Sequence, residues 1–505
     1  MSAQVRSRTA LILAVLAVTG CATLEGGTAQ VMSSLKQTGR SIAQAGQSMF
    51  DSPGDKAPII TDMKPGPYEP STLAVGEEKD LARQRGEALG FVRSEPLRQY
   101  LARIRTRILR ASGVTDVPGQ VVILANPAFG AYSTPDGNVY LAMGWFPYLG
   151  SEDEVAAIIA HELGHILLKH HSADLVSGFQ KRAQAAHELG LAAKMTIANR
   201  PPSKDDQRTL LGSQVLAGVS DNVVMPAWGR RQETAADLMG IDLLIRAGYS
   251  PVAMATMLEK YQAWEKQTQQ DREALRSRAG EVMRSDWGDE IKAVWNRTVE
   301  SLAASHPETS QRLSDVAGYL DRHYGDASLP ALQTVLWTEI RGVPEVREVL
   351  RNYDLAFSAR KLLEGGKSRD AYAYARDATG GRTATHAYPN WMLAQAAVAV
   401  GRSSEAVTAL NRAIDANEPL REVYDAMILV REQRGDLAGA LAWTDKASSI
   451  FGDAARWTPT RIRLLRKSGR VDEASAVALK CTLETPEWRQ LCQQANQTPV
   501  QRAGR

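Results

Sequence analysis

Two histidines four residues apart mark the part of this 505-residue chain that is best suited to chemistry. They are His161 and His165, and Glu162 directly follows the first. At about 100° per residue, helix positions four apart differ by ~40°, so both imidazoles lie on one helix face. This is the HExxH arrangement, in which the two histidines bind zinc and the glutamate acts on water. The spacing predicts a zinc site with Glu162 as the general base.

The residues around this motif predict the helix that positions it. Ser151 is followed three residues later by Glu154, a capping pattern, and an apolar run begins shortly afterwards. A catalytic zinc has three protein ligands and a fourth position left to water. A third ligand must therefore come from another part of the chain.

A second pair of side chains, Glu233 and Asp237, suits that role. They are also four residues apart and share one face of an expected helix. Glu233 would complete a His-His-Glu ligand set, and Asp237 would accept the remaining N–H of a ligating histidine. A solvated acidic face is the alternative, but Ala235, Ala236 and Leu238 indicate a closely packed helix. Buried carboxylates need partners, which zinc and histidine would supply.

The first 20 residues predict a signal peptide of lipoprotein type. A basic start precedes an apolar run over 10–18, which is too short to span a bilayer. The run ends in the sequence VTGC at Cys21, which resembles the bacterial lipoprotein box, so we expect Cys21 to be lipidated. The alternative is a plain signal peptide with a stray cysteine. Ala22 follows instead of aspartate, which by this resemblance favours anchoring to the outer membrane from the periplasm.

Length and charge limit the classes of protein that remain. A chain of 505 residues predicts two or three domains. Sixty basic and 57 acidic residues leave a net charge of +3, which argues against a nucleic-acid partner. Apart from Cys21, the cysteines are Cys481 and Cys492, which in an oxidising periplasm predict a disulfide. Two free thiols are the alternative.

The expected domain order places a tether at 21–71 before a peptidase-like domain at 72–345. Within the domain we expect helices at about 75–89 and 95–112 and strands at 120–124 and 138–143. A loop and tight turn are expected over 126–137, between the two strands. The free edge of the strand before the zinc helix could pair with an extended peptide. An ordinary two-stranded core element is the alternative.

Residues 346–482 contain a repeat with a period of 34–35 residues. The glycines of its four units are followed five positions later by alanines: Gly366 and Ala371, Gly401 and Ala406, Gly435 and Ala440, Gly469 and Ala474. This period is typical of tetratricopeptide repeats, with glycine at the inter-helix turn and alanine at a close helix contact. Such solenoids present a concave surface that binds proteins. A purely structural tail is the alternative, and 483–505 is expected to be a C-terminal tail.

Three motifs together resemble the HtpX-like and CAAX-prenyl-endopeptidase-like zinc metallopeptidases. They are HELGH at 161–165, RQETAAD at 231–237 and SHPETSQRL at 305–313. With a lipoprotein box before them and repeats behind, the chain looks most like the periplasmic, BepA-like branch. The resemblance implies a mainly α-helical, gluzincin-type domain with a small β-sheet, followed by an α-helical solenoid. It also implies one Zn²⁺ per chain and a role in quality control of envelope proteins.

The resemblance further implies a catalytic role for His306, near the metal, where it contacts substrate or caps the zinc. A helix-start residue before Pro307 is the alternative. Arg312 also matches a family position, with a structural salt bridge as an equal alternative. The other histidines are predicted to be surface or structural residues. His170, nine residues from His161, projects about 180° away on a continued helix, and His171 is likewise off the ligand face. No partner pattern accompanies His187, His323 and His386.

The sequence therefore predicts a membrane-anchored periplasmic zinc metalloendopeptidase. Its expected substrates are misfolded or mis-assembled envelope and outer-membrane proteins, with Glu162 activating water. The expected partners, bound through the repeats, are the outer-membrane protein assembly machinery or its clients. The alternative is a chaperone-like or scaffold lipoprotein whose repeats bind assembly intermediates, with proteolysis secondary.

Overall fold

The computed structural model describes residues 57–87, 90–171, 230–282, 309–452, 454–485 and 488–499. The predicted signal peptide, Cys21, most of the tether, His187 and His306 lie outside these ranges. No helix in the described ranges is long and apolar enough to cross a membrane. The mainly helical fold class with a small sheet, predicted from the sequence, is confirmed.

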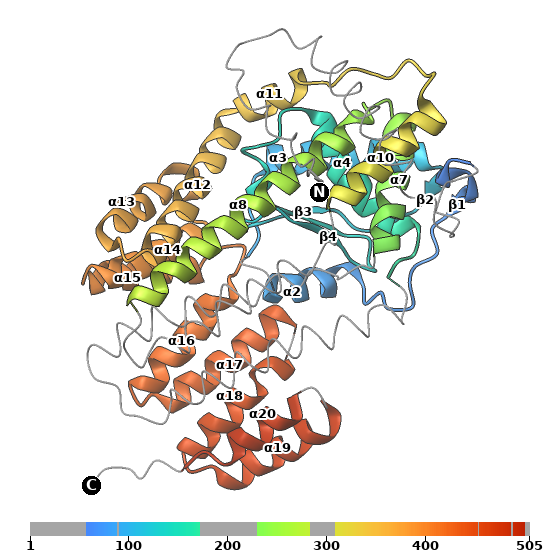
Figure 1. The fold of residues 1–505 in the computed structure, drawn as a ribbon. Coiled ribbons are helices and arrows are strands. Elements are labelled where there is room, and N and C mark those ends of the chain that lie inside the picture. The colour runs from blue at the N-terminus through green and yellow to red at the C-terminus, as the bar shows by residue number, and fades with distance from the viewer. Residues whose placement is uncertain are drawn as a thin grey trace, which may run out of the picture.

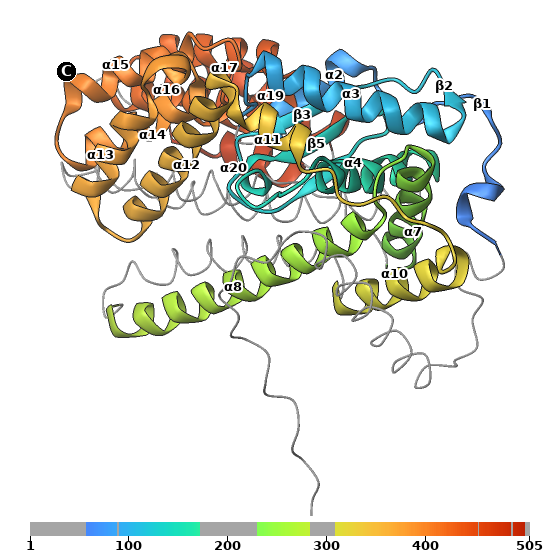
Figure 2. The same ribbon diagram turned by 90° about the horizontal axis from the view of Figure 1, so that it is seen from above.

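The N-terminal half is a three-stranded sheet with helices packed on both of its faces (Figure 1). Viewed from above, α8 (Val252–Val282) and α10 (Thr309–Tyr324) lie along one side of the molecule, and the helices of residues 344–451 lie along the other (Figure 2). The helices of this half are α2 (Glu77–Glu87), α3 (Glu95–Ser112), α4 (Glu152–Leu167), α7 (Arg230–Arg246), α8 (Val252–Val282), α10 (Thr309–Tyr324) and α11 (Val335–Gly342). Short 3₁₀ helices are η1 (Ile59–Asp62) and η2 (Met143–Trp145).

The sheet contains a strand that the sequence analysis missed. Strands β3 (Val121–Leu124) and β5 (Val139–Ala142) were predicted and pair in parallel, but β4 (Ala131–Ser133) was expected to be loop. All three residues of β4 are buried, so no alternation of polar and apolar side chains marks it. The strand order β3-β5-β4 makes β5 the central strand, so the free edge predicted for the strand before the zinc helix is in fact paired. Within the described residues, the edge of β4 beside α4 pairs with no strand. A two-residue pair, β1 (Gly66–Pro67) with β2 (Val114–Thr115), lies apart from this sheet.

The folded domain begins earlier than the predicted position 72. Ile59 and Ile60 in η1 are buried in the main core. The backbone N–H of Ile59 donates to Tyr319 Oη at 2.8 Å, and that of Ile60 donates to Asp242 Oδ2 at 3.0 Å. The composition of this stretch indicated a linker, but two isoleucines and two backbone hydrogen bonds are enough to dock it.

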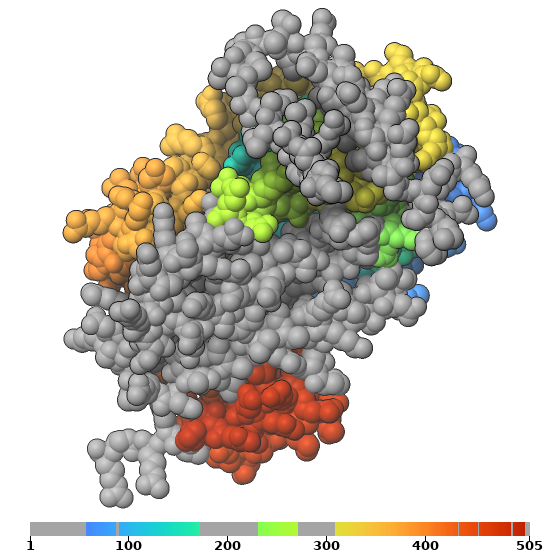
Figure 3. All heavy atoms as spheres, in the orientation of Figure 1, coloured from blue at the N-terminus to red at the C-terminus, as the bar shows by residue number. Residues whose placement is uncertain are grey.

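The C-terminal half, residues 344–496, is a continuous series of packed helices and is called the tail below; its last helices are red in Figure 3. Each of the four repeat glycines lies between two consecutive helices with φ between 72° and 79°, a left-handed conformation that favours glycine. The four alanines of the repeat are buried. The helices are α12 (Pro344–Glu364), α13 (Ser368–Ala378), α14 (Ala387–Ala399), α15 (Ser403–Ile414), α16 (Arg421–Gln433), α17 (Leu437–Phe451), α18 (Ala454–Lys467), α19 (Val471–Glu484) and α20 (Arg489–Asn496), with the 3₁₀ helix η3 (Gly381–Thr383). The assignment to tetratricopeptide repeats stays a prediction.

Two contacts stabilise this tail, one near its C-terminus and one near its middle. Cys481 in α19 and Cys492 in α20 form a disulfide. The second contact is made by α2, which lies between the sheet and helices α16 and α17 (Figure 1). The buried Arg421 donates to the carbonyl oxygen of Gly86 at 2.9 Å, and Gly86 packs against the ring of Phe451. The tail is therefore attached to the domain that holds the predicted metal site.

Candidate metal centre

Helix α4 carries the HExxH motif and is buried along nearly its whole length. It begins as predicted, with the side chain of Ser151 accepting a hydrogen bond from the backbone N–H of Glu154 at 3.2 Å. His161, Glu162 and His165 are at most 4% exposed. A buried helix that holds three polar side chains must offer them partners from the helices packed against it.

Helix α7 supplies these partners because small residues allow it to approach α4 closely. A methyl group added at Gly164 would lie 2.9 Å from the carbonyl oxygen of Ala236, and one at Gly240 would lie 3.3 Å from the backbone nitrogen of His161. Both separations are shorter than ordinary van der Waals contact. Glycine on each helix therefore sets the distance between α4 and α7, and with it the position of Glu233.

The two histidines and Glu233 converge on one point. The Nε2 atoms of His161 and His165 are 3.2 Å apart. The carboxylate oxygens of Glu233 lie 3.7 Å from Nε2 of His161 and 3.5 Å from Nε2 of His165. Zinc–nitrogen and zinc–oxygen bonds of ~2.0–2.2 Å in a tetrahedron place ligand atoms roughly 3.3–3.5 Å apart. The donor set and its spacing therefore fit a zinc ion bound by three protein ligands.

Asp237 and Arg312 surround this ligand set. Asp237 Oδ1 lies 2.8 Å from Nδ1 of His161, the nitrogen that faces away from the other two donors. Arg312 donates from Nε and Nη2 to the two oxygens of Asp237 at 2.7 and 2.8 Å. Its Nη1 lies 2.9 Å from Oε2 of Glu233. One guanidinium thus compensates two buried carboxylates.

These contacts shift the acid–base behaviour of the site. Burial by itself raises the pKa of Asp237, but Arg312 and His161 outweigh it and hold that pKa well below its usual range. Burial by itself lowers the pKa of His161, but the carboxylates of Asp237 and Glu233 outweigh it and raise that pKa. Asp237 is therefore a fixed negative charge, and it increases the basicity of the imidazole that it orients.

Arg312 is a site residue whose importance the sequence analysis left undecided. It lies on α10, 75 positions from Asp237, and is 3% exposed. The signal that could have identified it is electrostatic. Two carboxylates predicted to be buried on α7 require a buried cation, because an isolated charge is costly to remove from water.

His170 and His171 were placed wrongly by the helical projection. Helix α4 ends at Leu167, and Lys169 adopts φ 55°, so the chain turns back. His170 Nδ1 comes to 2.9 Å from Nδ1 of His165, and burial lowers the pKa of His170 to about 4. His171 is buried, with Nε2 3.2 Å from Oγ of Ser133 in β4. The side chain of His170 therefore lies against a proposed metal ligand, and that of His171 lies against the edge strand.

The remaining predicted residues have simpler outcomes. His323 packs its ring against Tyr319 and Tyr324, and His386 is buried beside Tyr353, in agreement with a structural role. His306, predicted to be catalytic, lies outside the described residues. Among the described residues, His161, His165 and Glu233 form a group that could hold a metal ion.

Comparison with known proteins agrees with this geometry. Residues 96–320 match the family model described as Peptidase family M48, which includes all the predicted metal ligands. The chain is 27% identical over 210 residues to the Beta-barrel assembly-enhancing protease of Escherichia coli (strain K12), an alignment that covers 41% of each protein.

Two further relatives match over shorter stretches. The chain is 28% identical over 172 residues to the Mitochondrial metalloendopeptidase OMA1 of Schizosaccharomyces pombe, covering 34% of this chain and 46% of that protein. It is 29% identical over 168 residues to the Metalloprotease LoiP of Escherichia coli, covering 33% and 61%. The chain thus matches about two fifths of the length of the Beta-barrel assembly-enhancing protease and a larger share of these two.

Proposed function

Because residues 96–320 of this chain form a metallopeptidase domain of family M48, we propose that the protein is a zinc metalloendopeptidase of the bacterial envelope. The observation that carries the proposal is the buried group of His161, His165 and Glu233, whose donor atoms lie within 4.8 Å of one another. Glu162 lies on α4, the helix that carries the two histidines of this group. Two neutral donors, one carboxylate and an adjacent base are the parts that peptide hydrolysis requires.

Each residue has a defined role in the proposed mechanism. His161, His165 and Glu233 would hold the zinc, which supplies a Lewis acid for the attacking water and the scissile carbonyl. Glu162 accepts a proton from the water and later passes it to the leaving amine. Asp237 fixes the ring of His161, and the guanidinium of Arg312 compensates the charges of Asp237 and Glu233 in the buried site.

One further residue of the proposed mechanism, His306, lies outside the described residues. His306 stabilises the oxyanion in this proposal, which follows from the family resemblance of its motif.

The edge of β4 supports an extended polypeptide as the substrate. β4 pairs with β5 on one side, and within the described residues no strand pairs with its other side. It packs against α4, and Ser133 at its end contacts His171 just beyond the HExxH helix. An extended segment that adds to this edge by backbone hydrogen bonds would run past the metal ligands. Such a segment is available in misfolded or unassembled proteins.

The proposed location is the periplasmic side of the outer membrane, with a lipid anchor at Cys21. The lipoprotein-type sequence that ends at Cys21 motivates the anchor. The Cys481–Cys492 disulfide suits an oxidising compartment. The name of the Escherichia coli relative, Beta-barrel assembly-enhancing protease, supports assembly intermediates of β-barrel proteins as the substrate class.

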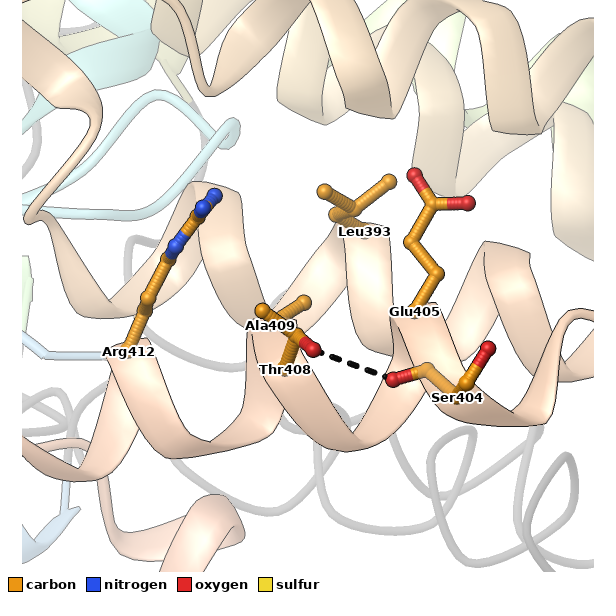
Figure 4. A pocket seen from close by; sticks show the side chains of 6 residues that line it. All are labelled: Leu393, Ser404, Glu405, Thr408, Ala409 and Arg412. Atoms are coloured by element: carbon orange, nitrogen blue, oxygen red, sulfur yellow. Dashed lines mark hydrogen bonds between the residues drawn. The ribbon is translucent and has the colours of Figure 1, made fainter.

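A second candidate function is capture of such intermediates by the tail. Helices α14 and α15 line a partly open hollow of about 310 Å³. Figure 4 shows Glu405 and Arg412 extending in the same direction from α15, with Leu393 of α14 between them. Opposite charges at the two ends of a partly apolar hollow suit a peptide segment of mixed character. In this alternative the tail binds clients, and proteolysis is secondary.

The substitution Glu162→Gln tests the first proposal. The variant should keep zinc at one ion per chain but lose cleavage of an unfolded substrate such as casein, because glutamine cannot accept the proton. Glu95→Gln, at an exposed carboxylate that pairs with Arg98, is the matched control and should cleave normally. Undiminished cleavage by the Glu162→Gln protein would exclude the mechanism.

The same variant distinguishes the two candidate functions in cells. A deletion strain that carries Glu162→Gln should show every defect of the deletion if proteolysis is the main function. Full rescue by this variant would instead make client binding by the tail the main function. Cross-linking of the variant in the periplasm would then identify the bound clients.

A further inference from the structure

We propose that His170 is a positioning residue of the metal centre, which holds the imidazole of His165 and thereby sets the affinity of the site for zinc. The inference rests on the proposed function, in which His165 is a zinc ligand. It assigns a role to a side chain that is not a ligand and lies beyond the end of the HExxH helix.

The backbone after the helix brings His170 back to the site. The N–H of Lys169 donates to the carbonyl of Ile166 at 3.1 Å, and the N–H of His170 donates to that of His165 at 3.0 Å. With Lys169 at φ 55°, these are the two hydrogen bonds of a Schellman motif. A lysine in the left-handed region is less favourable than glycine there. The turn nevertheless forms, and it directs His170 to the ring five positions earlier.

The rings of His165 and His170 approach each other through their Nδ1 atoms, which leaves Nε2 of His165 available for the metal. Nε2 of His165 faces His161 and Glu233, which leaves Nδ1 to point away from the metal position. Nδ1 of His170 lies 2.9 Å from it, and the rings are nearly perpendicular at 70°. A histidine that binds metal through Nε2 carries its proton on Nδ1 and donates it. Nδ1 of His170, with its own proton on Nε2, is the acceptor.

The two ligating histidines are therefore supported by different partners. Nδ1 of His161 contacts the carboxylate of Asp237, whose charge is compensated by Arg312. Nδ1 of His165 contacts an imidazole. A second carboxylate at this position would add another buried negative charge and would need another cation. The neutral imidazole of His170 orients the ring of His165 without the need for another buried cation.

Loss of an outer partner of a metal-ligating histidine typically lowers metal affinity about 10–100-fold. We expect His170→Phe to weaken zinc binding by about that factor, because phenylalanine has a similar shape but accepts no hydrogen bond. His170→Asn should recover most of the affinity, because the asparagine Oδ1 occupies nearly the position of the histidine Nδ1 and accepts. His171→Phe is the matched control, since its contact is with Ser133 and not with a proposed ligand.

The experiment measures the zinc dissociation constant of the full chain by competition with a chelator at fixed pH. The melting temperature of each metal-free protein is recorded in parallel. Weaker binding by His170→Phe, recovery by His170→Asn and near wild-type binding by His171→Phe would support the proposal. If phenylalanine prevents folding, His170→Ala replaces it in the same comparison.

Two results would overturn the inference and leave the proposed function intact. One is wild-type zinc affinity in His170→Phe, and the other is an equal loss of affinity in the asparagine and phenylalanine variants. The second result would mean that His170 only fills space at the helix end. Failure of the wild-type chain to bind zinc would overturn the proposed function itself, and this inference with it.

Discussion

The metal centre and the tail both consist of packed helices, but different interactions hold their helices together. At the metal centre, α4, α7 and α10 meet through a buried set of two carboxylates, two imidazoles and one guanidinium. In the tail, consecutive helices meet through buried alanines, and ion pairs such as Arg470–Glu473 and Lys480–Glu484 are exposed to solvent. Charge compensation is therefore decisive at the metal centre, and close apolar packing is decisive in the tail.

Glycine illustrates the same difference. Gly164 and Gly240 have ordinary helical positions and are needed because a neighbouring helix leaves no room for a side chain. Gly366 has open space around it and is needed because its φ is 72°. One region uses glycine for close approach and the other uses it for chain direction.

Removal of the shared cation should have the largest effect. Arg312→Gln leaves Asp237 and Glu233 without their buried cation, and breaking such a pair typically costs about 3–5 kcal/mol. The matched tail variant, Arg470→Gln, breaks an exposed pair with Glu473 and should cost less than about 1 kcal/mol. Denaturant unfolding of the zinc-free proteins measures both. Equal losses in the two variants would show that charge compensation does not distinguish the regions.

The buried His386 tests whether the apolar packing of the tail excludes a charge, because this side chain can take up a proton. Burial, with a smaller contribution from Arg93, lowers the pKa of His386 to about 4, below the ordinary 6.5. The unfolded chain therefore binds a proton at this histidine more readily than the folded chain does. The free energy of unfolding is unaffected by this group above pH 6.5 and decreases as pH falls from 6.5 towards 4. The loss is at most about 3 kcal/mol.

The measurement is the free energy of unfolding between about pH 4 and 7. The His386→Asn variant keeps an acceptor for the Tyr353 hydroxyl but does not titrate, so its profile should be flatter than that of the wild type. Comparison of the two proteins removes the contribution of the other histidines. Parallel profiles would mean that His386 is protonated at no cost in the folded tail.

The paired glycine substitutions should have the smallest effects. Gly164→Ala forces α4 and α7 apart and should cost about 1–3 kcal/mol, with weaker zinc binding because Glu233 moves with α7. Gly366→Ala meets no neighbouring atom but places alanine in the left-handed region, at a cost of about 1 kcal/mol. Its zinc affinity should stay unchanged. Thermal unfolding and zinc titration of both variants separate the two uses of glycine.

Much of the metal centre could be predicted from spacing alone. Positions four apart on a helix share a face, so helical periodicity is enough to pair His161 with His165 and Glu233 with Asp237. The repeat period likewise located the turns at Gly366 and Gly401. Strand β4 was missed because its three residues are all buried and show no alternation of polar and apolar side chains. The 3₁₀ helix η1 was missed because its hydrogen-bond partners lie 182 and 260 positions away in the sequence.

The sequence by itself determined which side chains could bind a metal, because helical periodicity acts over a few residues and needs no knowledge of the fold. Only the tertiary structure decided which groups support them. Arg312 reaches Asp237 through the packing of α10 on α7, and His170 reaches His165 through a turn at Lys169. Both contacts depend on where a helix ends or which helix it meets, and those outcomes are set by burial and charge compensation over the whole domain.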